Sequence, residues 1–185
     1  MTEIKSSSIA IDDLTAPEFG EFLSYWNSAR RDRMAPSWSD VELLEMPAKV
    51  LPYLTVVEVF HAPMDFVYSF YGTGHMALKA RDMTGCSVSE SKPLENKQVV
   101  LDQYRRVVET RKPMAFMREF FGFGFDGSLA QTTLRLPLSD DGESIRWIMS
   151  LSDLRGSPDM REFYEVHGRE RPTRAARARQ TVDAV

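Results

Sequence analysis

Residues 65–82 include side chains and a glycine-rich turn of the kinds that enzymes use in catalysis and in phosphate binding. Asp65, Asp82 and Tyr71 supply carboxylates and a hydroxyl, which could act as a general base and as a donor to a developing oxyanion. All three lie at the ends of predicted strands or in loops, where the sequence does not bring them into one pocket. Gly72-Thr73-Gly74 resembles the glycine-rich part of a phosphate-binding loop. The Gly-Lys-Ser/Thr sequence and the long helix that such a loop requires do not follow it. We therefore predict a turn at these glycines, no catalytic residue and no enzymatic activity.

His75 and Cys86 are the side chains best suited to bind a metal or to act as a nucleophile. A histidine can ligate a metal or titrate near neutral pH, and the chain has three histidines. The single cysteine cannot form an internal disulfide and, without clustered histidines, cannot complete a tetrahedral zinc site. We predict no metal site, a buried small thiol at Cys86 and a reducing compartment.

The composition is that of a folded, mildly acidic protein. Of its 185 residues, 43% are hydrophobic and 27% are charged, which suits one domain with flanking segments. The formal net charge of −4 gives no general attraction for nucleic acid. No segment approaches the roughly 20 apolar residues that span a bilayer. We therefore expect a cytoplasmic protein that neither binds nucleic acid nor inserts into a membrane.

The first predicted element is a helix that begins after Thr15. Thr15 and Glu18 have the spacing of a capping box, and Pro17 suits the first turn of a helix. The helix ends near residues 30–33, and its apolar stripe is formed by Phe19, Phe22, Leu23 and Trp26. Such a stripe must lie against something, so we predict a docking helix.

The later elements predict one antiparallel sheet with helices inserted in it. Runs of β-branched and aromatic residues between turn signals predict five strands, over residues 54–60, 65–71, 113–121, 129–138 and 146–154. Short helical turns are expected between residues 72 and 92, and a long amphipathic helix over residues 93–111. The predicted class is therefore α+β: a five-stranded antiparallel sheet with short helices and one long helix on one face, preceded by an N-terminal helix.

The predicted organisation has three parts. Residues 1–14 are mostly polar without a sustained period, so we predict a flexible leader there. Residues 15–155 form the domain with its N-terminal helix. Residues 156–185 are predicted to be a C-terminal helix or a mobile Arg-rich tail. Such a tail is either solvated or in contact with RNA, anionic lipid or an acidic partner.

Several short pieces of sequence in a fixed order carry a resemblance to a known family. They are LSYWNSAR followed by APSWSDVEL, then LPYLTVVEV, DFVYSFYGTGHMALKARDMTGCSVSE, YRRVVETRKP and LRLPLSDDGESIRWIMSLSDL. In order and spacing, from about residue 23 to residue 154, the chain resembles the PAS superfamily, and in particular the PAS_5 family of single-domain PAS-like proteins from alphaproteobacteria. Three arginines common in that family are replaced here by Trp38, Ser69 and Cys86. Contacts that need those guanidinium groups are not expected here.

The resemblance implies a small PAS-like pocket in which a few polar groups orient a ligand. The residues that we predict to line it are Tyr68, His75, Tyr104, Phe116, Arg118 and Trp147. Strand alternation does not decide which side chains point inward, because helices are expected on both faces of the sheet.

The resemblance favours neither haem nor flavin, and the identity of any cofactor stays open. Haem-binding relatives usually take their axial histidine from the long helix, and residues 93–111 contain none. Light-sensing flavin relatives have their reactive cysteine in an Asn-Cys-Arg context, whereas Cys86 stands in Thr-Gly-Cys-Ser. A capping or surface role is therefore expected for His75.

The leading hypothesis is a stand-alone PAS-like sensory or regulatory domain in signal transduction. It would bind a small apolar or aromatic ligand, a signalling protein, or both. The resemblance also implies a homodimer, because helices that flank the core of PAS proteins often form the dimer interface, and the candidate interface residues are Phe19, Phe22 and Trp26 of the N-terminal helix. Two alternatives stay open. One is a small enzyme with a cone-shaped sheet, similar to ketosteroid isomerase, and the other is an apolar-ligand carrier or adaptor.

Overall fold

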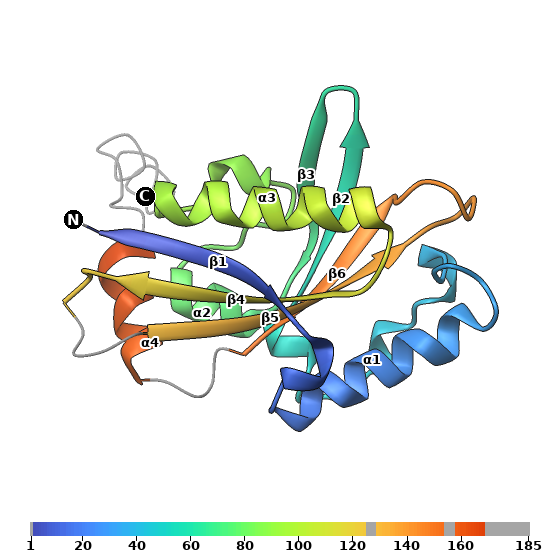
Figure 1. Ribbon diagram of the computed structural model, residues 1–185, viewed down its shortest axis with the longest axis horizontal. Coiled ribbons are helices and arrows are strands. Elements are labelled where there is room, and N and C mark those ends of the chain that lie inside the picture. The colour runs from blue at the N-terminus through green and yellow to red at the C-terminus, as the bar shows by residue number, and fades with distance from the viewer. Residues whose placement is uncertain (1, 125–128, 154–157, 169–185) are drawn as a thin grey trace, which may run out of the picture.

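One six-stranded antiparallel sheet forms the centre of the fold in the computed structural model, which describes residues 2–124, 129–153 and 158–168 (Figure 1). The strand order is β1-β4-β5-β6-β2-β3. The strands are β1 (Glu3–Ile9), β2 (Leu54–His61), β3 (Met64–Tyr71), β4 (Met114–Phe121), β5 (Leu129–Leu138) and β6 (Trp147–Ser152). The α+β class is confirmed, and so are the predicted hairpin and the three later strands, although Leu154 at the predicted end of β6 lies outside the described residues.

The first strand is the main departure from the prediction. A flexible leader over residues 1–14 and a sheet of five strands are both wrong, because Glu3–Ile9 pairs along its whole length with β4. Of its side chains only Ile4 is buried, so the segment has no alternating apolar pattern that a sequence could reveal. Its attachment is polar instead: Ser6 Oγ accepts a hydrogen bond of 2.8 Å from Gln103 Nε2.

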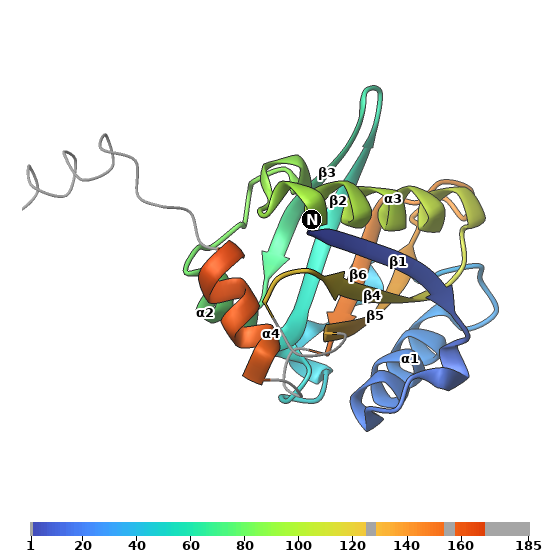
Figure 2. The ribbon, with the colours of Figure 1, turned by 60° about the vertical axis from the view of Figure 1, so that its left-hand side comes forward.

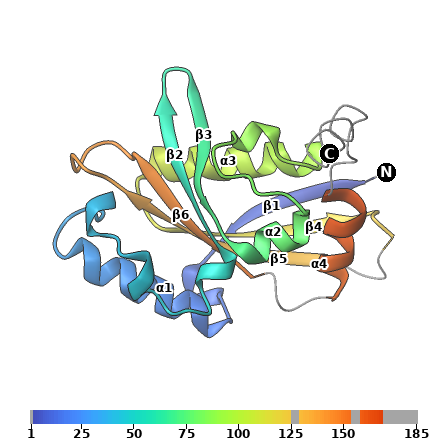
Figure 3. The same ribbon diagram turned by 180° about the vertical axis from the view of Figure 1, so that it is seen from behind.

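The sheet is covered on both faces, as Figures 2 and 3 show from two sides. Helix α1 (Pro17–Arg30) lies against one face, where it packs with Met149 and Leu151 of β6. The long helix α3 (Leu94–Thr110) lies against the other face, where it packs with Ile148. This alternation along β6 follows from the two-residue period of a strand. Within the described residues, no helix combines the length and the apolar character needed to cross a membrane.

The apolar stripe of α1 is part of the core, which corrects its predicted role as an association surface. Phe19, Phe22 and Trp26 are only 3%, 0% and 3% exposed. Trp26 Nε1 donates a hydrogen bond of 2.8 Å to the carbonyl oxygen of Pro137 in β5. The predicted capping box is also wrong, because the N-cap residue is Ala16 and no side chain caps the helix.

The chain passes from β3 into the short helix α2 (Thr73–Lys79) through Gly72, which fits tightly against the segment before β2. Gly72 N donates to the Leu54 carbonyl oxygen at 2.9 Å. A Cβ atom at Gly72 would lie 2.4 Å from the carbonyl oxygen of Pro52, closer than real Cβ contacts. The absence of a side chain therefore allows α2 to lie against the end of the sheet, with Gly72 as its N-cap.

The described C-terminal part is helical. Helix α4 (Pro158–Phe163) continues into a π-helical turn (Tyr164–Gly168), and these are the described residues of the segment 156–185. Phe163 packs on Phe120 at a ring-centroid distance of 4.6 Å and on Phe123 at 4.9 Å. The arginines of the predicted tail, from Arg169 onward, lie outside the described residues.

Candidate functional site

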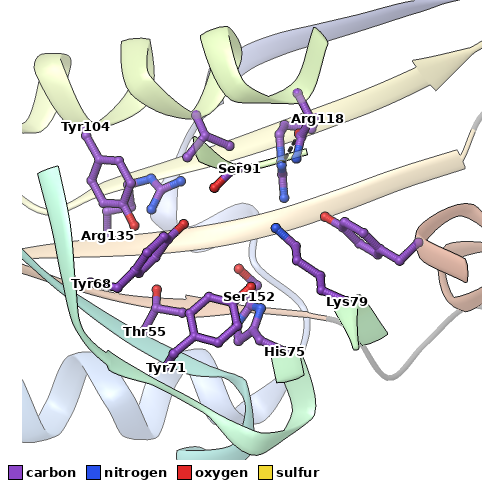
Figure 4. Close-up of a pocket in the computed structure, with 13 residues that line it drawn as sticks. Thr55, Tyr68, Tyr71, His75, Lys79, Ser91, Tyr104, Arg118, Arg135 and Ser152 are labelled. Atoms are coloured by element: carbon purple, nitrogen blue, oxygen red, sulfur yellow. Dashed lines mark hydrogen bonds between the residues drawn. The ribbon is translucent and has the colours of Figure 1, made fainter. Parts of the chain in front are cut away.

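A small buried cavity lies between the sheet and the helices at the end that carries α2 and the Tyr164–Gly168 turn (Figure 4). About 40 Å³ of it is accessible to the centres of water-sized molecules. All of β2 to β6 contribute to its lining, together with α2 and α3. Among the 13 lining residues, Val100 is the single aliphatic one, and none is an Asp or a Glu. The lining that the described residues form is therefore polar and contains no acidic side chain.

A bulge in β3 brings two tyrosines to the cavity side of the sheet. Val56 pairs with Phe70, but the next residue of β2, Val57, pairs with Tyr68, so Ser69 is left without a partner in the register. Tyr68 and Tyr71 therefore face the same side although they are three positions apart. Their rings meet edge to face at a centroid distance of 5.0 Å.

Arg118 enters the cavity from β4 and is 5% exposed. Its Nη1 donates to Asn96 Oδ1 and its Nη2 to Gln131 Oε1, both of which are neutral amides. Arg118 Nε is buried and has no hydrogen-bond partner within the described residues. The Arg118 guanidinium is thus oriented by its partners but is not neutralised by them.

Arg135 enters from β5 and is 3% exposed. Its Nη2 donates to Gln103 Oε1 at 2.7 Å, and its Nη1 donates to Ser150 Oγ at 2.8 Å. The guanidinium carbon lies 3.9 Å from the centroid of the Tyr104 ring, a close cation–π contact. Burial lowers the pKa of Arg135 from its usual value, and the nearby positive charge of Arg118 acts in the same direction.

Lys79 is the third cationic residue at the cavity, and its amino group points toward the same space as the two guanidinium groups in Figure 4. It is the last residue of α2, and its Nζ lies 5.4 Å from the centroid of the Tyr164 ring. Burial, with a smaller effect from Arg118, lowers the pKa of Lys79 to about 8. Lys79 therefore remains mostly protonated at neutral pH.

The tyrosine hydroxyls add neutral donors to the lining. Burial raises the pKa of both Tyr68 and Tyr71, and the neighbouring tyrosines add to the effect, so both hydroxyls stay protonated. Tyr71 Oη is buried and, in the part of the chain that the structure describes, has no hydrogen-bond partner. It is available to donate to a bound molecule.

His75 lines the cavity as a neutral side chain. Its Nε2 lies 2.9 Å from the carbonyl oxygen of Tyr53, which can only accept, so Nε2 carries the proton. The ring is 9% exposed and packs against Tyr71 at a centroid distance of 5.3 Å. Burial lowers the pKa of His75 to about 3, so it does not titrate near neutral pH. The expected capping or surface role is therefore wrong.

The low pKa of His75 predicts an acid sensitivity that the variant His75→Gln should lack. Because the pKa is about 3 in the folded state and about 6.5 in the unfolded state, the unfolded chain binds more protons between these values. Stability from neutral His75 is complete above pH 6.5 and is lost as the pH falls toward 3. Between pH 6 and pH 4, the wild type should lose up to about 1.4 kcal/mol per pH unit more than the variant.

Urea unfolding across the pH range measures this difference. Above about pH 7.5 the free energies of unfolding of the two proteins should run parallel, since His75 is then neutral in both states. Equal slopes between pH 6 and pH 4 would show that the imidazole accepts a proton in the folded protein.

Four of the six residues that the sequence predicted for the pocket line the cavity. They are Tyr68, His75, Tyr104 and Arg118. The other two predictions are wrong. Phe116 is on the cavity side of β4 but packs in the apolar core beside α3, and Trp147 lies on the opposite face of the sheet, where it stacks on Trp38 at 6.1 Å.

Arg135, Lys79 and Tyr71 complete the site and were not predicted as pocket residues. Arg135 could have been recognised from the sequence, because it stands in the otherwise apolar strand sequence LRLPL. A charged side chain in a buried strand needs polar partners, which indicates a site. Lys79 could not have been recognised in this way, since a lysine in the last turn of a helix is common.

The described residues contain no group of three or more His, Cys, Asp or Glu side chains that could hold a metal ion. Cys86 is half-buried and packs at the edge of the core beside α3.

Comparison with known proteins identifies no family for this chain. No protein-family model matches it, and no curated protein is similar to it at a significant level. The function is therefore inferred from the cavity itself.

Proposed function

We propose that the protein is a PAS-like regulatory domain that binds a small polar ligand in this cavity and carries out no chemistry. The observation that carries the proposal is that two residues of the cavity lining have buried polar atoms, Tyr71 Oη and Arg118 Nε, for which the described part of the chain offers no hydrogen-bond partner. Buried polar groups in native proteins nearly always have a hydrogen-bond partner, so atoms of this kind at a cavity indicate a bound molecule. An antiparallel sheet with a long helix on one face is compatible with a PAS-like fold.

The arrangement of the lining supports a regulatory role for the ligand. Tyr164 comes from the C-terminal turn, Lys79 from α2, and Arg118 and Arg135 from the sheet. A molecule that contacts all of them links three separate parts of the fold, so its presence changes how firmly the C-terminal segment is held. We propose that a signalling protein reads this change in the cytoplasm. A homodimer would have to use a surface other than the buried stripe of α1.

The alternative of a small enzyme is less well supported. Asp65 accepts a hydrogen bond of 2.7 Å from Ser87 Oγ, and Asp82 accepts one of 2.9 Å from the Thr84 backbone. Neither carboxylate lines the cavity, whereas Tyr71 does. A protonated tyrosine can stabilise an oxyanion, but proton abstraction also needs a base within hydrogen-bond reach.

The charged lining of the cavity favours a polar ligand over the apolar or aromatic ligand expected from the sequence.

Filling the cavity tests the proposal. Val100 is 8% exposed and lines the cavity from α3, so the larger side chain of Val100→Phe should occupy part of the space. We expect native mass spectrometry of the freshly purified wild type to show a defined additional mass that is released on unfolding. The variant should retain at least tenfold less of it. Val166→Phe is the matched control, because Val166 is 65% exposed and should leave binding unchanged.

A wild type without bound mass, whose thermal unfolding is not shifted by any member of a metabolite library, would contradict the proposed function. Equal retention by the wild type and Val100→Phe would place the ligand elsewhere on the protein.

A further inference from the structure

The charges at the cavity are unbalanced. Arg118, Arg135 and Lys79 reach it from β4, β5 and α2 (Figure 4). Within the described ranges, none of the three forms an ion pair, and the lining has no acidic side chain. Burying a charge without an opposite charge is costly, and proteins rarely do so outside functional sites.

Neutral protein groups orient the two arginines without compensating their charges. The guanidinium of Arg118 is held by two amide oxygens, and that of Arg135 by an amide oxygen and a hydroxyl. Guanidinium and ammonium groups are donors with no acceptor atoms. The buried Arg118 Nε still has a proton to donate, and so does the Tyr71 hydroxyl. The missing partner must therefore offer several acceptor atoms and a negative charge.

We propose that the ligand of this cavity is a small oxyanion, with a carboxylate or phosphate group held among Arg118, Arg135 and Lys79. This inference rests on the proposed function, because it specifies the ligand of the same site. Carboxylates and phosphates accept paired hydrogen bonds from a guanidinium group, which matches two arginines held in fixed orientations. The volume of about 40 Å³ limits the part of the ligand inside the cavity to a few atoms. Water alone would satisfy the donors but would leave the positive charges uncompensated.

The inference includes a specific dependence on pH. Lys79 shares the cavity with Arg118 of β4, Arg135 of β5, the neutral His75 of its own helix, and four tyrosines, which are Tyr68, Tyr71, Tyr104 and Tyr164. Among these groups, Lys79 is the one that loses its charge just above neutral pH, since its pKa is about 8. A bound oxyanion favours the protonated amine, so the affinity should fall by up to about tenfold between pH 7.5 and pH 9.

The test compares oxyanions with neutral analogues on the full chain after extensive dialysis. Isothermal titration is carried out with sodium acetate, malonate, succinate and phosphate, and with acetamide, malonamide and succinamide, all at equal ionic strength. We expect at least one oxyanion to bind saturably and its amide to bind at least tenfold more weakly. The carboxylate and phosphate series distinguish the two sources of the charged group.

Three variants connect the binding to the cations. Arg118→Gln and Arg135→Gln should each weaken the oxyanion at least tenfold. Arg105→Gln is the matched control, because Arg105 lies on α3 in a half-exposed pair with Asp102 at 2.7 Å, and should not change the affinity. If the buried variants do not fold, Lys79→Gln serves instead, because Lys79 is only half-buried. It should both weaken binding and abolish the change between pH 7.5 and pH 9.

The outcomes separate this inference from the function on which it rests. Equal binding of acids and amides, or undiminished oxyanion binding by the variants, would overturn the oxyanion but keep a ligand-binding cavity. No binding by any compound, together with no bound mass in the native spectrum, would overturn both.

Discussion

Replacing Trp26 by alanine is expected to lower the free energy of unfolding by about 3 to 5 kcal/mol. Trp26 is 3% exposed, and its removal leaves a cavity between α1 and the sheet that the neighbouring side chains cannot fill completely. It also removes the donor to the Pro137 carbonyl oxygen, which becomes a buried acceptor without a partner. Urea unfolding followed by circular dichroism measures the loss.

The exposed residue Leu44 provides the control for this substitution. Its side chain is 92% exposed, so Leu44→Ala should change the free energy of unfolding by less than about 0.5 kcal/mol. Size-exclusion chromatography with light scattering decides between the core and an interface. A Trp26→Ala protein that keeps its stability but changes its oligomeric state would restore the association surface that the sequence suggested.

Replacing Gly72 by alanine is expected to destabilise the protein by about 3 kcal/mol or more, the upper range for an overpacked site. The added methyl group would lie 2.4, 2.6 and 2.7 Å from the carbonyl oxygens of Pro52, Leu51 and Leu54. These are backbone atoms, which cannot rotate away as a flexible side chain can. The strain is relieved when α2 moves away from the sheet. Because α2 carries His75 and Lys79, ligand binding should be lost even where the protein still folds.

Gly20 is the matched control, since it is also a glycine but lies within α1 with no atom near the position of an added Cβ. Gly20→Ala should stabilise the protein by roughly 0.5 to 1 kcal/mol, because alanine loses less backbone entropy in a helix. Thermal unfolding of both variants, with titration of the ligand into each, measures the two effects. If Gly72→Ala binds with unchanged affinity, the position of α2 is not set by this contact.

The sequence predicted the elements whose own periodicity shows a buried face. The stripes of α1 and α3 and the alternating runs of the β2–β3 hairpin are of this kind. A periodic stripe shows that a face is covered but not what covers it, so Phe19, Phe22 and Trp26 were assigned to a partner when they pack on their own sheet. β1 was missed because backbone hydrogen bonds, rather than apolar side chains, hold a serine-rich edge strand.

The site was predicted only in part, for reasons that lie in its geometry. Simple alternation places Tyr68 and Tyr71 on opposite faces, and only the bulge at Ser69 brings them together. Arg118 is an ordinary strand arginine in a sequence, and although Arg135 stands in an apolar run, the neutral surroundings of both become visible only when their partners are known. The charge imbalance is a property of residues spread from Lys79 to Arg135, and no local pattern encodes it.

The amide of Gln103 joins the inside of the protein to its N-terminal edge. Its oxygen accepts from Arg135, and its nitrogen donates to Ser6 of β1. One planar group thus makes both contacts, and a rotation that follows a displaced guanidinium would also break the hydrogen bond to Ser6, while the backbone pairing of β1 with β4 remains. Strand β1 is therefore connected through Gln103 to an arginine that lines the cavity. Removing β1 would leave Gln103 Nε2 without its Ser6 partner and so loosen the amide that orients Arg135.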